Sequence, residues 1–306
     1  MGRRQCFACQ DYAKGKRRTR PTPYAAAAPP ARPVADPDRT PPVDERRAYA
    51  PPPSLVLPAP KSGTRRCLFV PDCHFPNVHE SAWALMLRAA HRFRPDVVAI
   101  LGDFLDGESV SLHDPDAPSK MDFETELTAV RDALDQLEEL KPSLKIYVEG
   151  NHEQRLSRYL ARNAPGVYRS MSVPEALDLG GRDWRWVPYR RSIRLGHVRL
   201  THDTGSAGMN AHRSSAKVSG GSTVIGHTHR MAYEVTGRLD DAPYLAAMLG
   251  WLGDAQKAAG YMHEAKAAEW VHGFGVGLLD DATGIMFLQP VPIVGGRCWV
   301  AGELIS

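Results

Sequence analysis

Metal-ligand side chains recur in four short motifs of this 306-residue chain. The motifs and one isolated histidine are Asp72-x-His74, Gly102-Asp103-x-x-Asp106, Gly150-Asn151-His152-Glu153, His202 and Gly226-His227-x-His229. Carboxylate, imidazole and amide groups without a thiolate suit a site for Mn, Fe, Zn or a mixture of these ions better than a structural zinc site. The residue types therefore predict a centre that binds divalent metal ions.

Each motif alone carries little weight, because a chain with 12 His contains some Asp-x-His and His-x-His pairs by composition. The alternative interpretation is a scatter of core and surface histidines. The ordered set is improbable by chance, since an apolar run precedes every motif and a glycine opens three of them. Glycine at a tight turn lets the backbone come close to a site, so we favour the metal centre.

The elements that must position these motifs can be predicted from the hydrophobic pattern. Apolar runs over Cys67–Val70, Asp96–Leu101 and Leu144–Val148 predict buried strands. Helical spacing of apolar residues predicts helices over residues 80–94, 122–140 and 152–162. Alternating strands and helices indicate a parallel α/β arrangement, in which the carboxyl ends of the strands converge on one crevice.

Short strand patterns separated by turn signals occupy the second half of the chain. They cover Trp184–Val187, Ser192–Leu195, Val198–Thr201, Thr223–Ile225, Ala232–Thr236, Gly275–Leu279 and Ile285–Val291. We expect antiparallel pairing there. We also expect one catalytic domain over residues 65–306, in which two sheets pack face to face with helices outside them.

Taken in order, the motifs resemble those of the calcineurin-like metallophosphoesterases, and the resemblance covers residues 67–229. It implies an α/β fold, a four-layer α/β/β/α sandwich of two mixed sheets around a two-metal centre. It also implies the ligands: Asp72, His74 and His229 for one metal, Asn151, His202 and His227 for the other, and Asp103 as the bridge. Residues 148–160, 226–230 and 270–277 are similar to phosphoesterases of bacteriophage and prophage genomes.

Such a centre would hydrolyse phosphate esters without a covalent enzyme intermediate. Two divalent cations would share a hydroxide, clamp two phosphoryl oxygens and stabilise the charge of an in-line attack. The resemblance makes His152 the group that stabilises or protonates the leaving oxygen, with Asp106 orienting it. A loop-capping role is the alternative for Asp106.

Two positions depart from the family pattern. Gly107-Glu108 follows the second motif where the protein serine/threonine phosphatases carry Arg-Gly, which argues against that activity. His202 is followed by Asp203 where Gly is common, which leaves His197 as a competing ligand. We favour His202, because His197 precedes the predicted strand Val198–Thr201 and would point toward the opposite edge of the sheet.

Residues 1–64 differ from the rest in composition. They hold 13 of the 25 prolines, with 12 basic and 5 acidic residues, so we expect a disordered Pro/Arg-rich leader. Its Cys6-x-x-Cys9 reads as two free thiols or as half of a zinc knuckle. The remaining residues, with 26 basic and 30 acidic side chains, lack the basic footprint of a nucleic-acid-binding domain.

Nucleic acid stays a possible partner through the leader and residues 182–199. That segment has six Arg interleaved with Trp184, Trp186 and Tyr189, a pattern that suits a bound strand or a half-buried β-strand equally. His113 and His212 could line a substrate pocket, although exposure to solvent is the commoner situation for such residues. We expect Cys67, Cys73 and Cys298 to be packing residues.

The expected function is therefore hydrolysis of a phosphomonoester or phosphodiester. A nuclease or nucleotide phosphodiesterase acting on DNA or RNA is one alternative, and a non-catalytic binding module on the same scaffold is another. An odd number of Cys, five, suits a reducing compartment, and we identify no signal peptide and no apolar run long enough for a membrane span. We therefore expect a cytoplasmic protein, in the bacterial host if the gene is phage-encoded, and the sequence sets no oligomeric state.

Overall fold

Parallel strands separated by helices build the first half of the chain, as predicted. The computed structural model describes residues 63–111, 121–168, 170–239, 242–257 and 268–306. Strands β1 (Thr64–Val70), β2 (Val97–Ile100) and β3 (Leu144–Val148) pair in parallel. The intervening helices are α2 (Glu80–Phe93) and α3 (Phe123–Glu138). The Asp122 carboxylate accepts the backbone N–H of Thr125 at 2.8 Å and so caps α3 at its predicted start.

Two large sheets carry most of the strands. The first sheet has six strands in the order β11-β10-β1-β2-β3-β4, with β4 (Trp184–Val187), β10 (Gly273–Asp280) and β11 (Met286–Pro292) completing it. The second has five strands in the order β5-β6-β7-β9-β8: β5 (Ile193–Leu195), β6 (Val198–Thr201), β7 (Thr223–Ile225), β9 (Tyr244–Leu249) and β8 (Met231–Thr236). A small ribbon pairs β12 (Cys298–Val300) with β13 (Glu303–Ile305).

The prediction of antiparallel pairing in the second half is wrong for several strands. β4 joins the first sheet parallel to β3, and β6, β7 and β9 run parallel to one another. Between β6 and β7 lies α6 (Ala211–Ser219), and a parallel pair needs such a crossover. The antiparallel expectation holds for β5 with β6, β8 with β9, and β10 with both β1 and β11.

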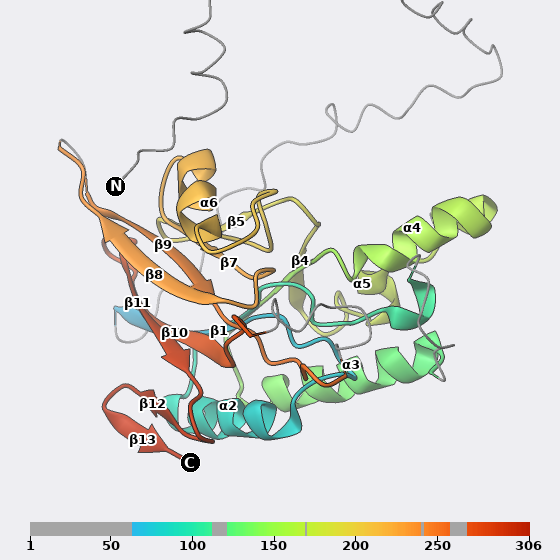
Figure 1. The fold of residues 1–306 in the computed structure, drawn as a ribbon, viewed down its shortest axis with the longest axis horizontal. Helices are drawn as coiled ribbons and strands as arrows, with labels where there is room; N and C mark the ends of the chain where they lie inside the picture. The colour runs from blue at the N-terminus through green and yellow to red at the C-terminus, as the bar shows by residue number, and fades with distance from the viewer. Residues whose placement is uncertain (1–62, 112–120, 169, 240–241, 258–267) are drawn as a thin grey trace, which may run out of the picture. The chain divides into compact units, whose positions relative to one another are not determined.

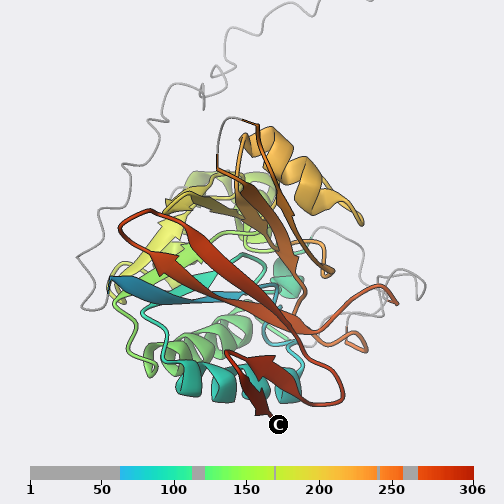
Figure 2. The same ribbon diagram turned by 90° about the vertical axis from the view of Figure 1, so that its left-hand side faces the viewer.

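Side-chain alternation along the strands divides the interior into layers. In β1, Leu68 and Val70 face α2 and α3, whereas Cys67 and Phe69 face the second sheet. On the outer side of the second sheet, Ala211 of α6 packs against β7 and β9. Figures 1 and 2 show α2 and α3 on one side of the sheets and α6 on the other. The predicted four-layer α/β/β/α sandwich of two mixed sheets is therefore confirmed.

The remaining helices are short or begin late. Helix α4 (Gln154–Asn163) starts two residues after its predicted start, because the preceding residues form a turn at the site described below. Helix α5 spans Val173–Ala176, and single 3-10 turns cover Glu108–Val110 and Pro165–Val167. Among the described residues, none of the helices combines the length and the apolar character that crossing a bilayer requires.

Several predictions concern residues outside the described ranges. They include the leader apart from positions 63 and 64, with its Cys6-x-x-Cys9 motif, and His113. The structure begins β1 at Thr64, one residue before the expected start of the catalytic domain. The boundary between leader and domain stays a prediction.

Candidate metal centre

The predicted ligands follow strands whose carboxyl ends meet between the two sheets. Asp72, Asp103 and Asn151 come after β1, β2 and β3, and His202 and His227 follow β6 and β7. Three overlapping groups of potential ligand atoms result, each within 4.8 Å: Asp72, His74, Asp103 and His229; Asp103, His202 and His227; and His74, Asp106 and His152. The sheets thus bring residues from 72 to 229 to one place.

The backbone at this place is held in an uncommon conformation. Five of the predicted metal ligands have positive φ: Asp72, His74, Asp103, His227 and His229. Non-glycine residues adopt this left-handed region at a cost that the surrounding structure must offset, and such residues concentrate at functional sites.

Two of the motif glycines lie against the carboxylates of the site. A Cβ at Gly150 would lie 2.2 Å from Asp103 Oδ1, and a Cβ at Gly226 would lie 2.6 Å from Asp72 Oδ2. Both positions therefore exclude any side chain.

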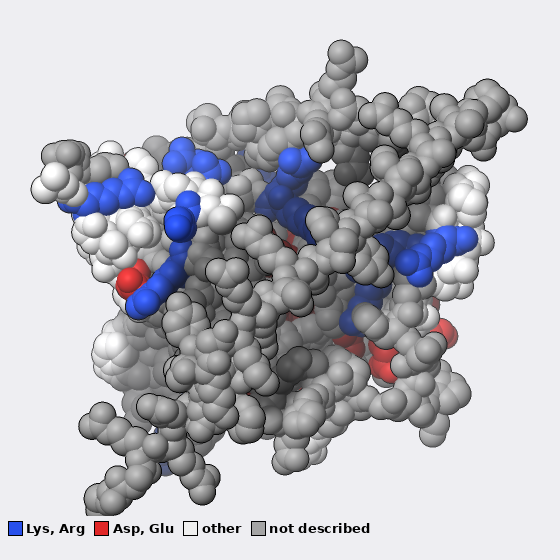
Figure 3. All heavy atoms as spheres, turned by 45° about the horizontal axis from the view of Figure 1, so that its top comes forward, with Lys and Arg blue, Asp and Glu red and all other residues white. Residues whose placement is uncertain are grey.

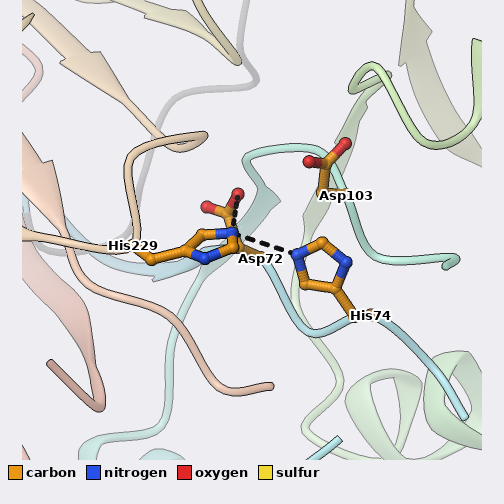
Figure 4. Close-up of side chains that lie close together, drawn as sticks. All are labelled: Asp72, His74, Asp103 and His229. Atoms are coloured by element: carbon orange, nitrogen blue, oxygen red, sulfur yellow. Dashed lines mark hydrogen bonds and ion pairs between the residues drawn. The ribbon is translucent and has the colours of Figure 1, made fainter. Parts of the chain in front are cut away.

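The first group has two imidazoles facing each other beside a buried carboxylate. His74 Nε2 lies 3.1 Å from His229 Nε2, which in turn lies 3.6 Å from Asp72 Oδ1 (Figure 4). The backbone N–H of His227 donates to Asp72 at 2.8 Å and fixes that carboxylate. Two nitrogens at this separation, with carboxylates on either side, can both direct lone pairs at one cation.

The second group shares Asp103 with the first. His202 Nε2 lies 3.2 Å from Asp103 Oδ2 and 3.1 Å from Asn151 Oδ1. The other nitrogen, Nδ1, donates to the Leu101 carbonyl at 2.8 Å, so Nε2 is the nitrogen that faces the group. His227 Nδ1 is buried and has no hydrogen-bond partner among the described residues, as expected of an atom available to a cation.

Position separates His202 from its competitor His197. His202 is fully buried at the carboxyl end of β6 within the second group. His197 lies in the turn between β5 and β6, where its backbone N–H donates to the Gly284 carbonyl. The two histidines stand at opposite ends of β6, as the sequence argument required.

The third group contains the residues for which we predict acid chemistry. His152 Nδ1 lies 2.7 Å from Asp106 Oδ1, and the backbone N–H of His152 donates to Asp103 Oδ1 at 2.9 Å. Asp106 Oδ2 accepts from the Asn77 amide at 2.6 Å. A carboxylate only accepts, so Nδ1 of His152 carries a hydrogen and Nε2 is left facing Asp103 Oδ2, at 3.9 Å.

Glu153 anchors the loop that carries Asp103, a role that the sequence analysis missed. Its fully buried carboxylate accepts the backbone N–H groups of Asp103, Phe104, Leu105 and Gly150 at 2.8–3.0 Å. The Tyr147 hydroxyl donates to it as well, at 3.0 Å. A charged acceptor with five donors fixes two of the site loops relative to each other.

The histidines of the site fall into two groups, one with lowered and one with raised pKa values. Burial lowers the pKa of His229 and of His227, with the nearby charges of His74 and His202 adding to the effect, so both imidazoles are neutral and able to bind metal. Burial opposes protonation of His202 too, but the charge of Asp103 outweighs it and raises the pKa to about 10. Asp106 raises the pKa of His74 against the same opposition.

An aromatic wall flanks the first group. Trp251 stacks on His229 with ring centroids 4.6 Å apart and planes 10° from parallel, and Trp270 meets the same imidazole edge-on at 4.5 Å. Both tryptophans follow the last recognised motif. Trp270 opens the WVHGFGVG run, which gave no indication of a contact with His229, and Trp251 lies in none of the motifs named above.

These observations fit the donor set of a divalent metal centre. Imidazole, carboxylate and amide atoms converge without a thiolate, Asp103 belongs to two of the groups, and one buried nitrogen has no partner among the described residues. The buried His and Asp clusters indicate that divalent metal binds here. The predicted division into two sites and the role of each ligand stay predictions.

Other predicted residues lie elsewhere. In the segment 182–199, Arg182 pairs with Asp135 at 2.5 Å, and the Trp184 indole donates to Glu138. His212 is buried on α6 with its Nε2 3.8 Å from Glu234, outside the three groups. The exposure expected for such a histidine is therefore wrong, and a role in lining a substrate pocket stays a prediction. Cys67, Cys73 and Cys298 are buried free thiols in the core, as expected.

Comparison with known proteins gives one family match. The model of the calcineurin-like phosphoesterases matches residues 65–231, more than half of the chain. A solved structure, that of TT1561 of Thermus thermophilus, has 13% sequence identity with this chain and a TM-score of 0.30, covering 74% of this chain and 99% of its own. No curated protein matches the chain.

Proposed function

Because the chain belongs to the calcineurin-like phosphoesterase family, we propose that it hydrolyses phosphate esters with the help of divalent metal ions bound at the Asp/His groups. The observation that carries the proposal is the shared position of Asp103. One of its carboxylate oxygens lies 3.2 Å from His202 Nε2, and the same residue belongs to the group of Asp72, His74 and His229. A carboxylate so placed can serve two cations at once.

We assign the ligands as the resemblance implies. Asp72, His74 and His229 would hold one ion, Asn151, His202 and His227 the other, and Asp103 would bridge them. Bound ions would polarise the phosphoryl oxygens and acidify water, and Mn, Fe and Zn all suit these donors.

The protein's own residues handle the leaving group. Water attacks phosphorus and releases a proton, and the bond from phosphorus to the ester oxygen breaks. That oxygen takes a proton from Nε2 of His152 in its doubly protonated form, and the proton released by the water replaces it. The tautomer is set by Asp106, because its carboxylate oxygen 2.7 Å away accepts from Nδ1 and directs Nε2 toward Asp103. The products are an alcohol and a phosphate carrying one ester bond fewer.

Hydrolysis of a substrate panel tests this proposal. Metal-stripped protein would receive Mn²⁺, Zn²⁺ or Mg²⁺ and then an aryl phosphomonoester, a bis-aryl phosphodiester or single-stranded DNA. Metal-dependent turnover of either small ester supports the proposal. Cleavage of DNA with strong salt sensitivity, weakened by deletion of residues 1–64, would favour the nuclease alternative instead.

Inactivity with every metal would contradict the proposal and leave a non-catalytic binding module on the same scaffold. The cytoplasmic location and the resemblance to phage phosphoesterases stay predictions.

A further inference from the structure

A guanidinium covers the reactive nitrogen of the proposed acid. Arg155 Nη2 lies 3.1 Å from His152 Nε2, and Nη1 of the same side chain donates to the Asp106 carbonyl at 2.9 Å. The side chain is 15% exposed, so one part of it is held by the protein while another still meets solvent. Arg155 comes three residues after His152 and is the second residue of α4.

The stem of this side chain packs beside Gly107. A Cβ at Gly107 would lie 3.6 Å from Arg155 Cδ and 3.2 Å from the His152 carbonyl, so the stem of the arginine packs over the loop that follows Asp106. This is the loop in which Gly107-Glu108 stands in place of Arg-Gly. Here α4 places a guanidinium beside the same loop.

We propose that Arg155 binds the terminal phosphoryl group of the substrate and thereby selects dianionic phosphomonoesters over phosphodiesters. This inference rests on the proposed function, because it needs the leaving oxygen to lie at His152 Nε2. A group 3.1 Å from that nitrogen reaches the phosphoryl oxygens of the same ester. A guanidinium binds two oxygens in a fork and gains most from a doubly charged, unsubstituted phosphate.

We expect bound substrate to replace the contact between Arg155 and His152 by one between Arg155 and the phosphate. Because Nδ1 of His152 donates to Asp106, Nε2 accepts from Arg155 Nη2. A phosphoryl oxygen is a charged acceptor and competes for that donor. Arg155 then turns to the phosphate, and Nε2 can take up the proton that it gives to the leaving oxygen.

Helix α4 carries other arginines besides Arg155, so the test needs a matched control variant. Arg158 and Arg162 are exposed on the same helix, and Figure 3 shows blue side chains on the side of the molecule where α4 lies in Figure 1. Arg158 contacts Gln154 of its own helix at 3.3 Å. Arg158→Gln removes the same charge one turn away from the site and measures general attraction of anions.

The first test is calorimetric binding of inorganic phosphate to the Mn²⁺-loaded protein. We expect Arg155→Gln to weaken phosphate binding by about 10- to 100-fold, Arg155→Lys to weaken it less, and Arg158→Gln to change it by less than about twofold. Mn²⁺ affinity should stay within about twofold in all three variants, which also reports that they fold. Unchanged phosphate binding in Arg155→Gln, or an equal loss in Arg158→Gln, would overturn the inference.

The second test separates substrates. For Arg155→Gln we expect kcat/KM to fall by about 100-fold with an aryl phosphomonoester and by less than about fivefold with a bis-aryl phosphodiester. Equal losses with the two esters would overturn the selection of monoesters. If the wild type hydrolyses neither ester with any metal, the proposed function fails, and this differs from an active wild type whose Arg155→Gln variant behaves like it.

Discussion

Glu153 Oε2 accepts the backbone N–H of Asp103 at 3.0 Å, so a buried carboxylate holds the residue that we propose as the bridge between two metals. Replacement by Gln puts an amide N–H where donors from the loop now point. We expect Glu153→Gln to lower the free energy of unfolding by about 1–3 kcal/mol and to weaken Mn²⁺ binding by about 10- to 100-fold.

Tyr147→Phe is the matched control for that variant, because it removes one donor to Glu153 and leaves the four backbone donors. Its loss in unfolding free energy should be about 1 kcal/mol, with little effect on Mn²⁺ affinity. Urea unfolding and metal titration measure both quantities. Wild-type metal affinity in Glu153→Gln would show that this anchor does not position the site.

Substitutions of Asp103 and of His152 should affect metal binding differently. Asp103→Asn should lose metal and activity together, because its carboxylate belongs to two ligand groups. His152→Ala should keep metal and lose turnover by about 10²- to 10⁴-fold, as removal of a general acid does. Metal content by elemental analysis, measured beside kcat, distinguishes them, and equal metal loss in both variants would contradict this division of roles.

Metal affinity should fall as the pH is lowered. The charge of Asp103 raises the pKa of His202 to about 10 and Asp106 raises that of His74, in both cases against burial, so protons occupy nitrogens that a cation needs. Each displaced proton should weaken the apparent Mn²⁺ affinity by about tenfold per unit of falling pH. Titrations at pH 6 and pH 8 measure this, and a pH-independent Kd would rule out displacement of protons.

The core cysteines should react slowly. Burial raises the pKa of the Cys73 thiol, with the charges of Asp72 and Glu153 adding to it, and burial also raises the pKa of Cys67. Less thiolate forms at pH 8, so alkylation of both should be at least about tenfold slower than in urea-unfolded protein. Peptide mapping by mass spectrometry after iodoacetamide treatment follows each cysteine. Rapid labelling of Cys73 in the folded protein would mean that the site opens.

Strand positions were predictable where the hydrophobic pattern was simple. Trp184–Val187, Val198–Thr201 and Thr223–Ile225 occupy the predicted residues, because short apolar runs were bounded by turn signals. Pairing direction was not predictable, since β8 follows β7 in sequence but lies at the edge of the sheet beyond β9. The strand Tyr244–Leu249 was missed altogether.

In the candidate site, too, the local motifs could be predicted and the contacts between distant residues could not. Ligand motifs could be found because each combines unusual residue types at fixed spacing. Glu153 and Arg155 stood in or beside a recognised motif, but their contacts depend on how the loop of Asp103 folds against α4. Trp251 follows β9 by two residues and touches His229 because β9 pairs in parallel with β7, the strand that precedes His229. Such contacts come from tertiary packing rather than from local pattern.

Titration of Mn²⁺ into metal-stripped protein, with bound metal and hydrolysis of an aryl phosphomonoester followed in the same sample, tests the central claim most directly. We predict that activity is absent without metal, rises with bound metal and saturates at two ions per chain, and that Asp103→Asn shows neither binding nor activity. Hydrolysis by the metal-free protein, or full metal binding without any turnover, would contradict the account.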